Sequence, residues 1–475
     1  ALTIVSLSGF FSCGVDRWPE YAHQTALDTW ILDIMQQNYL WYQELPSYDD
    51  VNLFVEPASF LSKVKSKQDS YSFVDSVMAT PLPTYGFDYS LVRNPDIDTA
   101  YNALITYVIP GSPAAQAGLE RGDWIMKVDT SYISKKYETY LLQGTKAVKL
   151  TLGEWKEVEI EDEEDGNEGG DGEDEGPTME YRVVPIDDPV EMPAAQIVED
   201  NPVHKYEIIE SPVKKIRVGY LMYNSFTAGT KAEPEKYNNE LRSVSQKFKE
   251  AGVQAVILRY NEGGSMDCVQ LLGTILTSAD RLGEPMAYLE YNDKNTDKDA
   301  TILFGTDREI NLNLHSLIAI TSGTTMGAPE MLIRSLFLED TYPIATVGSS
   351  TKGQNVATEQ FINEEFLWSV NPVVCTVYNS QHDTYGAISP ATDLKVSETT
   401  IDGSTNYSEF LPFGTFDKDG KSERLLKIAI GVLDGTYPPK DDETPEESTT
   451  QTRFKVEKSA SSPASRRFSS KGLRL

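Results

Sequence analysis

Cysteine, histidine and positive charge are all scarce in this sequence of 475 residues. Three cysteines are too few for a scaffold held by disulfides, and neither their spacing nor the four scattered histidines match a metal-binding cluster. Acidic residues outnumber lysine plus arginine by 73 to 42, and the net charge of −31 argues against nucleic-acid binding, which needs a basic surface. We therefore expect several globular domains that use no metal, no cofactor and no nucleic acid.

Long apolar runs are also missing from the body of the chain, where none reaches the roughly 18 residues that cross a membrane. The exception is Ala1–Cys13, a small and apolar stretch typical of the core of a signal peptide. A cysteine at the end of such a stretch resembles a bacterial lipoprotein signal with Cys13 as the lipidated residue. Ser12 fits that signal, Phe10 and Phe11 fit it poorly, and an ordinary signal peptide is the alternative. We predict export to the cell envelope (periplasm or outer membrane), with a lipid on Cys13 as the membrane anchor.

Shifts in residue pattern divide the chain into five parts. Residues 1–19 are the signal segment and a linker, and residues 20–80 carry apolar side chains at helical spacing, which predicts a small helical domain. Residues 81–200 contain short β runs, and residues 203–439 alternate strands and helices, which predicts a largely parallel sheet covered by helices. Residues 440–475 are a linker and a basic tail, either packed on the acidic body or disordered. The predicted fold class is therefore multidomain α/β.

The second part carries a specific pattern at residues 111–129, where a Gly-Ser-Pro turn, a short helix and Gly118 precede a β-strand. This pattern resembles the PDZ domain of bacterial envelope proteases. PDZ domains bind the carboxy-terminus of a peptide by strand addition. The resemblance implies that Tyr85, Gly86 and Phe87 form the loop that holds the carboxylate. A PDZ-shaped spacer that binds nothing is the alternative.

An acidic insertion at residues 157–177 interrupts this domain. Twelve carboxylates and no lysine or arginine lie between Glu157 and Glu175. Such a run repels itself and cannot bury apolar surface, and its spacing does not match an EF-hand. We predict a solvated, disordered loop rather than a calcium site.

Two strand-to-helix turns in the fourth part are candidates for chemistry, because sites in parallel sheets form at the carboxyl ends of strands. The first turn, Asn261–Gly264, presents the amides of Gly263 and Gly264 at the start of a helix, an arrangement suited to an oxyanion hole. The second turn, Thr321–Glu330, would direct position 327 into the same crevice.

Four segments together resemble the C-terminal processing (tail-specific) serine peptidases: GYLMYNSF (219–226), AVILRYNEGG (255–264), TSGTTMGAPE (321–330) and VGSSTKGQNV (347–356). The resemblance covers nearly the whole chain and is greatest for lipoprotein members from Bacteroidetes. It implies an N-terminal helical domain, a PDZ-like β domain and a crotonase-like α/β peptidase domain, with polypeptides or protein C-termini as partners. It also implies proteolysis by a Ser–Lys dyad, in which desolvation must lower the pKa of the lysine.

Both dyad positions depart from the family pattern. The family's serine lies in a Ser-Ala-Ser-Glu-like turn, and aligning the glutamate of that turn on Glu330 places Gly327 at the serine. The family's lysine lies in a Gly-x-x-Thr-x-Gly-Lys turn, and aligning that turn with residues 348–353 places Gln354 at the lysine. Glycine has no nucleophile, and glutamine cannot take a proton near neutral pH. Gly263, Gly264 and Ala328 are the residues that we expect at the oxyanion hole. The sequence therefore predicts a degenerate peptidase that binds polypeptides without cutting them.

Two other functions stay open. An active serine- or threonine-type peptidase could use a displaced dyad of Thr325 and Lys352, and an envelope scaffold could bind nothing at its PDZ domain. If the alignment is right, Gly327 and Gln354 should face each other in a pocket that Met326 also lines. An amine of Lys352 within hydrogen-bond reach of Thr325 would favour the active enzyme.

Overall fold

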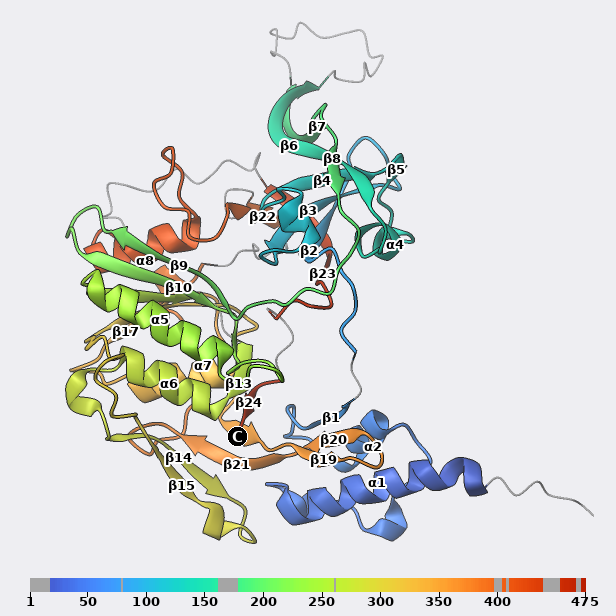
Figure 1. Cartoon of the computed structure of the whole chain (residues 1–475), viewed down its shortest axis with the longest axis vertical. Helices are drawn as coiled ribbons and strands as arrows, with labels where there is room; N and C mark the ends of the chain where they lie inside the picture. Colours follow the sequence, from blue (N-terminus) through green and yellow to red (C-terminus); the bar gives the residue numbers. More distant parts are fainter. Residues whose placement is uncertain are drawn as a thin grey trace, which may run out of the picture. The chain divides into compact units, whose positions relative to one another are not determined.

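The structure is a computed structural model of the chain (Figure 1) that describes residues 18–77, 80–160, 178–259, 262–396, 404–406, 410–438, 453–466 and 471–475. Cys13 and most of the predicted acidic insertion, residues 161–177, lie outside the described residues. The chain forms two compact units. Unit 1 comprises Ala1–Ala79, Tyr291–Lys298 and Thr358–Cys375, and unit 2 comprises Thr80–Glu290, Asp299–Ala357 and Thr376–Leu475. Among the described residues, no helix has both the length and the apolar character that crossing a membrane requires.

Unit 1 combines helices with a small sheet. The first helix buries Leu27, Ile31 and Met35, whose spacing of four residues places them on one face. An antiparallel sheet has the order β1-β20-β19, so the predicted helical domain at residues 20–80 also contains a strand. The elements of unit 1 are α1 (Trp18–Asn38), η1 (Tyr42–Glu44), η2 (Tyr48–Asp50), α2 (Pro57–Val64), β1 (Phe73–Ser76), η4 (Thr296–Lys298), β19 (Phe361–Asn363) and β20 (Trp368–Asn371).

The first part of unit 2 is a β domain with one continuous antiparallel sheet of order β22-β23-β2-β3-β4-β6-β7. Two of its strands, β22 and β23, come from far later in the sequence than the rest. Strands β5 and β8 pair with β4 and β6. The elements are β2 (Phe87–Arg93), β3 (Tyr101–Val108), α3 (Pro113–Gln116), β4 (Trp124–Val128), β5 (Ser131–Tyr132), α4 (Glu138–Leu142), β6 (Val148–Ile160), β7 (Thr178–Pro185), β8 (Val190–Met192), β22 (Ser404–Asn406) and β23 (Arg453–Ala460).

The second part of unit 2 is built on a five-stranded sheet of order β17-β16-β12-β10-β9. Strands β10, β12, β16 and β17 are parallel, and only β9 runs antiparallel to its neighbour β10. The parallel sheet predicted from alternating strands and helices is confirmed. The strands are β9 (Val203–Glu210), β10 (Arg217–Tyr223), β12 (Ala255–Arg259), β16 (Leu317–Thr321) and β17 (Ile344–Gly348).

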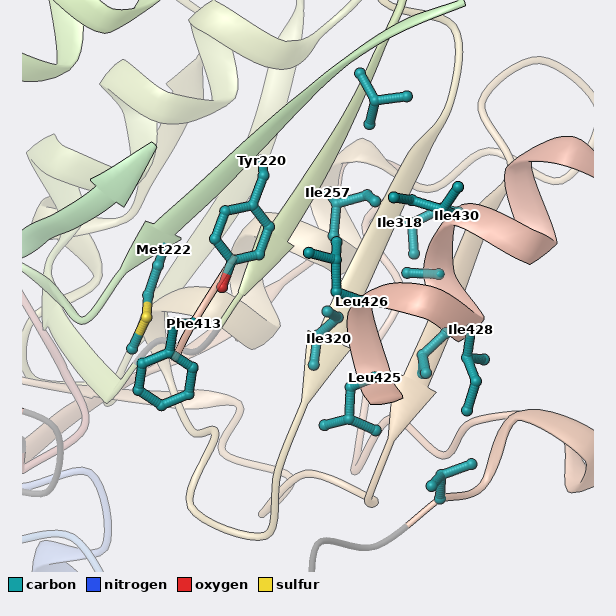
Figure 2. Packing of buried hydrophobic residues seen from close by; sticks show 14 of the residues in the cluster. Tyr220, Met222, Ile257, Ile318, Ile320, Phe413, Leu425, Leu426, Ile428 and Ile430 are labelled. Atoms are coloured by element: carbon teal, nitrogen blue, oxygen red, sulfur yellow. The ribbon is translucent and has the colours of Figure 1, made fainter. Parts of the chain in front are cut away.

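Helices cover both faces of this sheet. On one face, Leu425, Leu426 and Ile428 of α8 (Arg424–Asp434) pack against alternate sheet residues such as Tyr220 and Ile257 (Figure 2). Helix α5 (Lys236–Glu250) lies on the other face. Gly219 and its neighbour Tyr220 face opposite sides of the sheet, and a Cβ atom on Gly219 would overlap the ring of Phe248 on α5. The remaining helical elements are α6 (Met266–Leu276), η3 (Ala279–Arg281), α7 (Ala328–Leu336) and η5 (Thr392–Leu394).

A further sheet has the order β11-β13-β24-β18-β21-β14-β15. Its strand β13 pairs in parallel with β11 on one side and with β24 on the other, and Figure 1 shows β24 next to β13. This sheet therefore brings Leu473 and Arg474 beside Gly264 and Ser265. The strands are β11 (Ser225–Phe226), β13 (Glu262–Ser265), β14 (Pro285–Tyr291), β15 (Ala300–Leu303), β18 (Val356–Thr358), β21 (Val373–Tyr378) and β24 (Leu473–Arg474).

Candidate functional site

The turns after β16 and β17 bring positions 327 and 354 together. Gly327 precedes α7 with φ 70° and ψ −105°, a conformation that glycine adopts readily and that strains residues with a side chain. Gln354 follows β17, and its side chain is fully buried. A Cβ atom built on Gly327 would lie only 2.6 Å from Oε1 of Gln354. The two positions are therefore in direct contact.

A single buried carboxylate, that of Glu330, holds the two turns in register. Its Oε2 accepts hydrogen bonds from the amides of Gly327 and Gln354, both at 2.8 Å. Its Oε1 accepts from the amide of Gly353 at 2.5 Å and from the hydroxyl of Thr351. Burial raises the pKa of Glu330, and these four hydrogen bonds oppose that rise because they stabilise the charged form. The carboxylate thus joins the start of α7 to the turn after β17.

The amides of Gly263 and Gly264 in the first turn bind two different parts of the chain. The amide of Gly263 donates to the carbonyl of Met326 at 3.0 Å and so ties β13 to the second turn. The amide of Gly264 points into the crevice and donates to the carbonyl of Gly472 at 2.7 Å. Ala328 occupies the first position of α7 and is fully buried. Of the three residues expected at an oxyanion hole, Gly264 is the one whose amide contacts a carbonyl from the segment in the crevice.

That segment is β24 together with Gly472, and it fills the crevice. Strand β24 adds in parallel to β13, with Leu473 opposite Gly264, and Leu473 is fully buried. The amide of Leu473 donates to Oε1 of Gln354 at 3.4 Å. A Cβ atom on Gly327 would lie 2.5 Å from the nitrogen of Leu473 and 3.0 Å from the carbonyl carbon of Gly472. The space expected as an open pocket beside Met326, Gly327 and Gln354 thus holds the peptide bond between residues 472 and 473.

Comparison with known proteins identifies the family. The chain is 37% identical to a protein of Bacteroides fragilis assigned to the S41 proteases, with a TM-score of 0.73, and the match covers 86% of this chain and 97% of that one. The chain is an S41 peptidase family member. A model of the peptidase S41 N-terminal domain matches residues 26–73, and a PDZ domain model matches residues 104–151. No curated protein matches the chain.

Two more distant solved structures are also similar to this S41 family member. The photosystem II D1 C-terminal processing protease is 15% identical, with a TM-score of 0.41 and coverage of 79% of this chain and 92% of that one. Mature CPAF is 12% identical, with a TM-score of 0.42 and coverage of 87% and 97%. Together, the family models and the Bacteroides fragilis structure confirm the predicted architecture of an N-terminal helical region, a PDZ domain and an S41 protease-like α/β fold.

The residues of the alternative dyad in this S41 member do not meet through their side chains. The backbone amide of Lys352 donates to the carbonyl of Thr325 at 3.0 Å, but the side chain of Lys352 is exposed. The hydroxyl of Thr325 is buried and accepts a hydrogen bond from the amide of Ser322 at 3.1 Å. Within the described ranges, the amine of Lys352 has no hydrogen bond to Thr325 or to the neighbouring Thr324. Thr325 therefore stabilises its own turn.

The loop predicted to hold a peptide carboxylate in the PDZ domain is buried and bonded internally. Tyr85 and Phe87 are almost fully buried, and the amide of Gly86 donates to the hydroxyl of Thr84 at 3.1 Å. The next residue, Asp88, is buried as well. Its two carboxylate oxygens accept hydrogen bonds from a later part of the chain (the amide of Ser462 and the hydroxyl of Ser465), and peptide binding by Tyr85, Gly86 and Phe87 stays a prediction.

Sequence reasoning missed Gly472 and Leu473, which fill the crevice, and Asp88, which receives the later segment. The sequence did contain a pattern that indicates a short strand: in Gly-Leu-Arg-Leu (472–475), a small residue is followed by alternating large aliphatic and basic residues. Residues 453–457 also alternate between charged and apolar side chains, the pattern of a strand with one buried face. The excess of positive charge in this region indicated a basic tail, and both packing on the acidic body and disorder stayed open.

Proposed function

We propose that this S41 family member binds polypeptides at the family's cleft without hydrolysing them. The observation that carries the proposal is the pair of Gly327 and Gln354, which lie in contact where the sequence alignment places the nucleophile and its base. Neither residue can attack a carbonyl or accept a proton near neutral pH. The amide of Gly264 still directs its N–H into the crevice, so a feature needed for binding a peptide carbonyl is retained while the reacting groups are missing.

Other nucleophiles near the crevice do not replace the dyad in this proposal. The hydroxyl of Thr325 is engaged within its own turn, and the only amine suggested for it, on Lys352, is exposed. Cys268 on α6 is fully buried and donates to Oδ1 of Asn238 at 3.4 Å. Burial raises the pKa of its thiol, so the reactive thiolate is disfavoured. We infer that no described side chain at this site performs the family's first chemical step.

Turnover and binding assays test this proposal. We expect the purified chain to leave an unfolded model protein such as casein intact, as in a sample without enzyme, while binding a fluorescent unfolded polypeptide in an anisotropy titration. Cleavage that Thr325→Ala or Lys352→Ala abolishes would refute the proposal in favour of the displaced dyad. Lack of binding to any polypeptide, both by the unmodified chain and by a Leu473→Asp variant in which the segment at 472–474 is weakened, would refute its binding half and favour a scaffold.

The dyad can also be rebuilt by substitution, and the contacts around position 327 indicate which residues must change. Serine and lysine act as a unit, so Gly327→Ser alone should restore nothing and the double change with Gln354→Lys is needed. Because a Cβ at position 327 would lie 2.5 Å from the nitrogen of Leu473, the segment at 472–474 must also leave. We expect casein cleavage only when the double change is combined with Leu473→Asp.

We also propose that the protein is exported and lipid-anchored through Cys13, which the apolar stretch before it supports. Radiolabelled palmitate should be incorporated into the chain when it is expressed in a bacterial host with its N-terminal region, and Cys13→Ser should abolish the label. Labelling that persists in Cys13→Ser would contradict the anchor at this position.

A further inference from the structure

Two segments late in the chain, 453–466 and 471–475, lie on the two surfaces of unit 2 that the family architecture makes available to peptides. The first segment forms β23, which pairs with β2 of the PDZ sheet and on its other side with β22, and the second forms β24 along β13 in the crevice. We propose that these segments are an intramolecular peptide ligand, and that the crevice is a groove for a strand with a small residue followed by a large aliphatic one. The inference rests on the proposed function in that it names the kind of peptide which the cleft accepts.

The PDZ end of this ligand is held by backbone pairing and by charged side chains. Strand β23 runs antiparallel to β2, with Ala460 opposite Tyr89, which is the strand addition by which a sheet edge receives a peptide. Lys458 forms an ion pair with the buried carboxylate of Glu138 on α4. Burial alone would raise the pKa of Glu138, but hydrogen bonds from Lys458, Thr139 and Tyr89 lower it. The strand thus lies on β2 and reaches α4, as a bound peptide would.

The chain then continues past the loop where a peptide carboxylate would end. The amide of Ser462 donates to Oδ1 of Asp88 at 2.8 Å, and the hydroxyl of Ser465 donates to Oδ2 at 3.0 Å. A peptide carboxylate beside Asp88 would be repelled by this buried acid, whereas the N–H of a continuing chain is attracted to it. Further on, the amide and the side chain of Arg466 donate to Asp200 at 2.7 and 2.6 Å. The PDZ edge is therefore built for an internal sequence of a chain rather than for its terminal carboxylate.

In the crevice, the peptide bond between Gly472 and Leu473 lies against Gly327 and Gln354, the positions that the sequence alignment assigns to the family's serine and lysine. The Gly472 carbonyl accepts from Gly264, and the Leu473 amide donates to Gln354. Gly472 has φ 92°, and a Cβ on it would lie 2.2 Å from Oε1 of Gln354, so only glycine fits this position in this register. Leu473 is fully buried, whereas the side chain of Leu475 is 38% exposed. These contacts define the preference for a small residue followed by a buried aliphatic residue.

Tethering makes this ligand a competitor of any external peptide. A segment on the same chain has a high effective concentration, of the order of mM for a short flexible connection, so a free peptide must displace it. An external polypeptide should therefore bind the groove weakly in the unmodified chain and more tightly once the resident strand is weakened.

Hydrogen exchange of the full chain tests whether the strand occupies the groove. We expect the amides of residues 262–266 to exchange about tenfold faster or more in Leu473→Asp, because a buried leucine is replaced by a charge. Gly472→Val should act in the same direction as an independent variant. Leu475→Asp is the matched control, since it makes the same change at an exposed side chain and should leave exchange unaltered. Equal exchange in Leu473→Asp, Gly472→Val and the control would overturn the proposal.

Peptide binding separates this inference from the proposed function. The probe is a fluorescent peptide with blocked ends and the sequence Lys-Gly-Leu-Arg-Leu, measured by anisotropy. We expect binding to Leu473→Asp to be at least about tenfold tighter than to the unmodified chain or Leu475→Asp, and a probe with valine in place of glycine to bind more weakly. Equal affinity for all three chains would overturn the resident ligand. If hydrogen exchange responds as expected but the freed groove binds neither this probe nor casein, the result supports the docked strand and refutes the proposed binding of polypeptides.

Discussion

Glu330→Gln is the substitution whose effect the structure specifies in most detail. The Glu330 carboxylate accepts four hydrogen bonds, from the amides of Gly327, Gly353 and Gln354 and from the hydroxyl of Thr351. Glutamine keeps one acceptor oxygen and replaces the other by an NH2 group, so it cannot satisfy the three amides and must also give up the negative charge.

The cost depends on which way the new amide turns. With its oxygen toward Gly327 and Gln354, the NH2 group faces Thr351, whose hydroxyl oxygen already accepts from the amide of Ile388. The amide of Gly353 then loses its partner, and the hydroxyl proton of Thr351 loses its acceptor. One unsatisfied buried N–H costs about 1–3 kcal/mol, and the two retained bonds weaken because their acceptor is no longer charged. We therefore expect Glu330→Gln to lower the free energy of unfolding by about 2–4 kcal/mol.

Urea unfolding followed by circular dichroism measures this loss, with hydrogen exchange of residues 351–355 reporting whether the turn after β17 loosens first. Glu339→Gln is the matched control, because Glu339 is exposed in the turn that follows α7 and should change stability by less than about 0.5 kcal/mol. A Glu330→Gln variant as stable as this control would refute the argument that one carboxylate joins the two turns.

Two further predictions concern buried charges elsewhere. Burial raises the pKa of Asp28 to about 7, against a hydrogen bond from Gln24 that lowers it, so the folded state holds more protons than the unfolded state between pH 4 and 7 and loses stability as the pH rises through that window. Asp28→Asn should therefore raise the free energy of unfolding at pH 8 by about 4 kcal/mol and change it little at pH 4, as urea titrations at both pH values would reveal. An equal gain at both pH values would contradict the assignment. Arg259 and Glu423 form a fully buried ion pair. Arg259→Met should lower the free energy of unfolding by about 3–5 kcal/mol in the same assay, and adding Glu423→Leu should recover most of that loss. A double variant no more stable than the single one would show that the unpaired charge is not the cause.

The fold was predictable where local patterns determine it. Continuous apolar strands such as 255–259 and 317–321, each followed by a glycine-rich turn, indicated a parallel sheet, and a parallel sheet places its turns at one edge. The contact between Gly327 and Gln354 followed from aligning two short motifs with a known family rather than from periodicity. Glu330, used only as an alignment anchor, is the residue that joins the two motifs physically.

The partners of the late strands could not be predicted in the same way. Ser90 on β2 and Ser459 on β23 are joined by a hydrogen bond across 369 positions of sequence, and a strand's own residues do not indicate which distant edge it will join. Charge counting described residues 453–475 correctly as basic but did not indicate that their N–H groups and lysines would meet buried acids such as Asp88 and Glu138. Burial of an acid is a property of the folded state, and the sequence shows only that acids are abundant.

The two departures from the dyad are related to each other through the strand in the crevice. A serine at 327 would place its Cβ 2.5 Å from the nitrogen of Leu473, so glycine supplies the space that the strand needs. A charged lysine at 354 would offer three donors and no acceptor, whereas Gln354 accepts a hydrogen bond from the amide of Leu473 through Oε1 and donates to the carbonyl of Val356 at 2.9 Å through Nε2. Each replacement removes a reacting group and, at the same position, provides what the bound peptide bond requires. In the proposed function, the loss of chemistry and the gain of a resident ligand are therefore one structural change, in which a site that would cut a strand holds one instead.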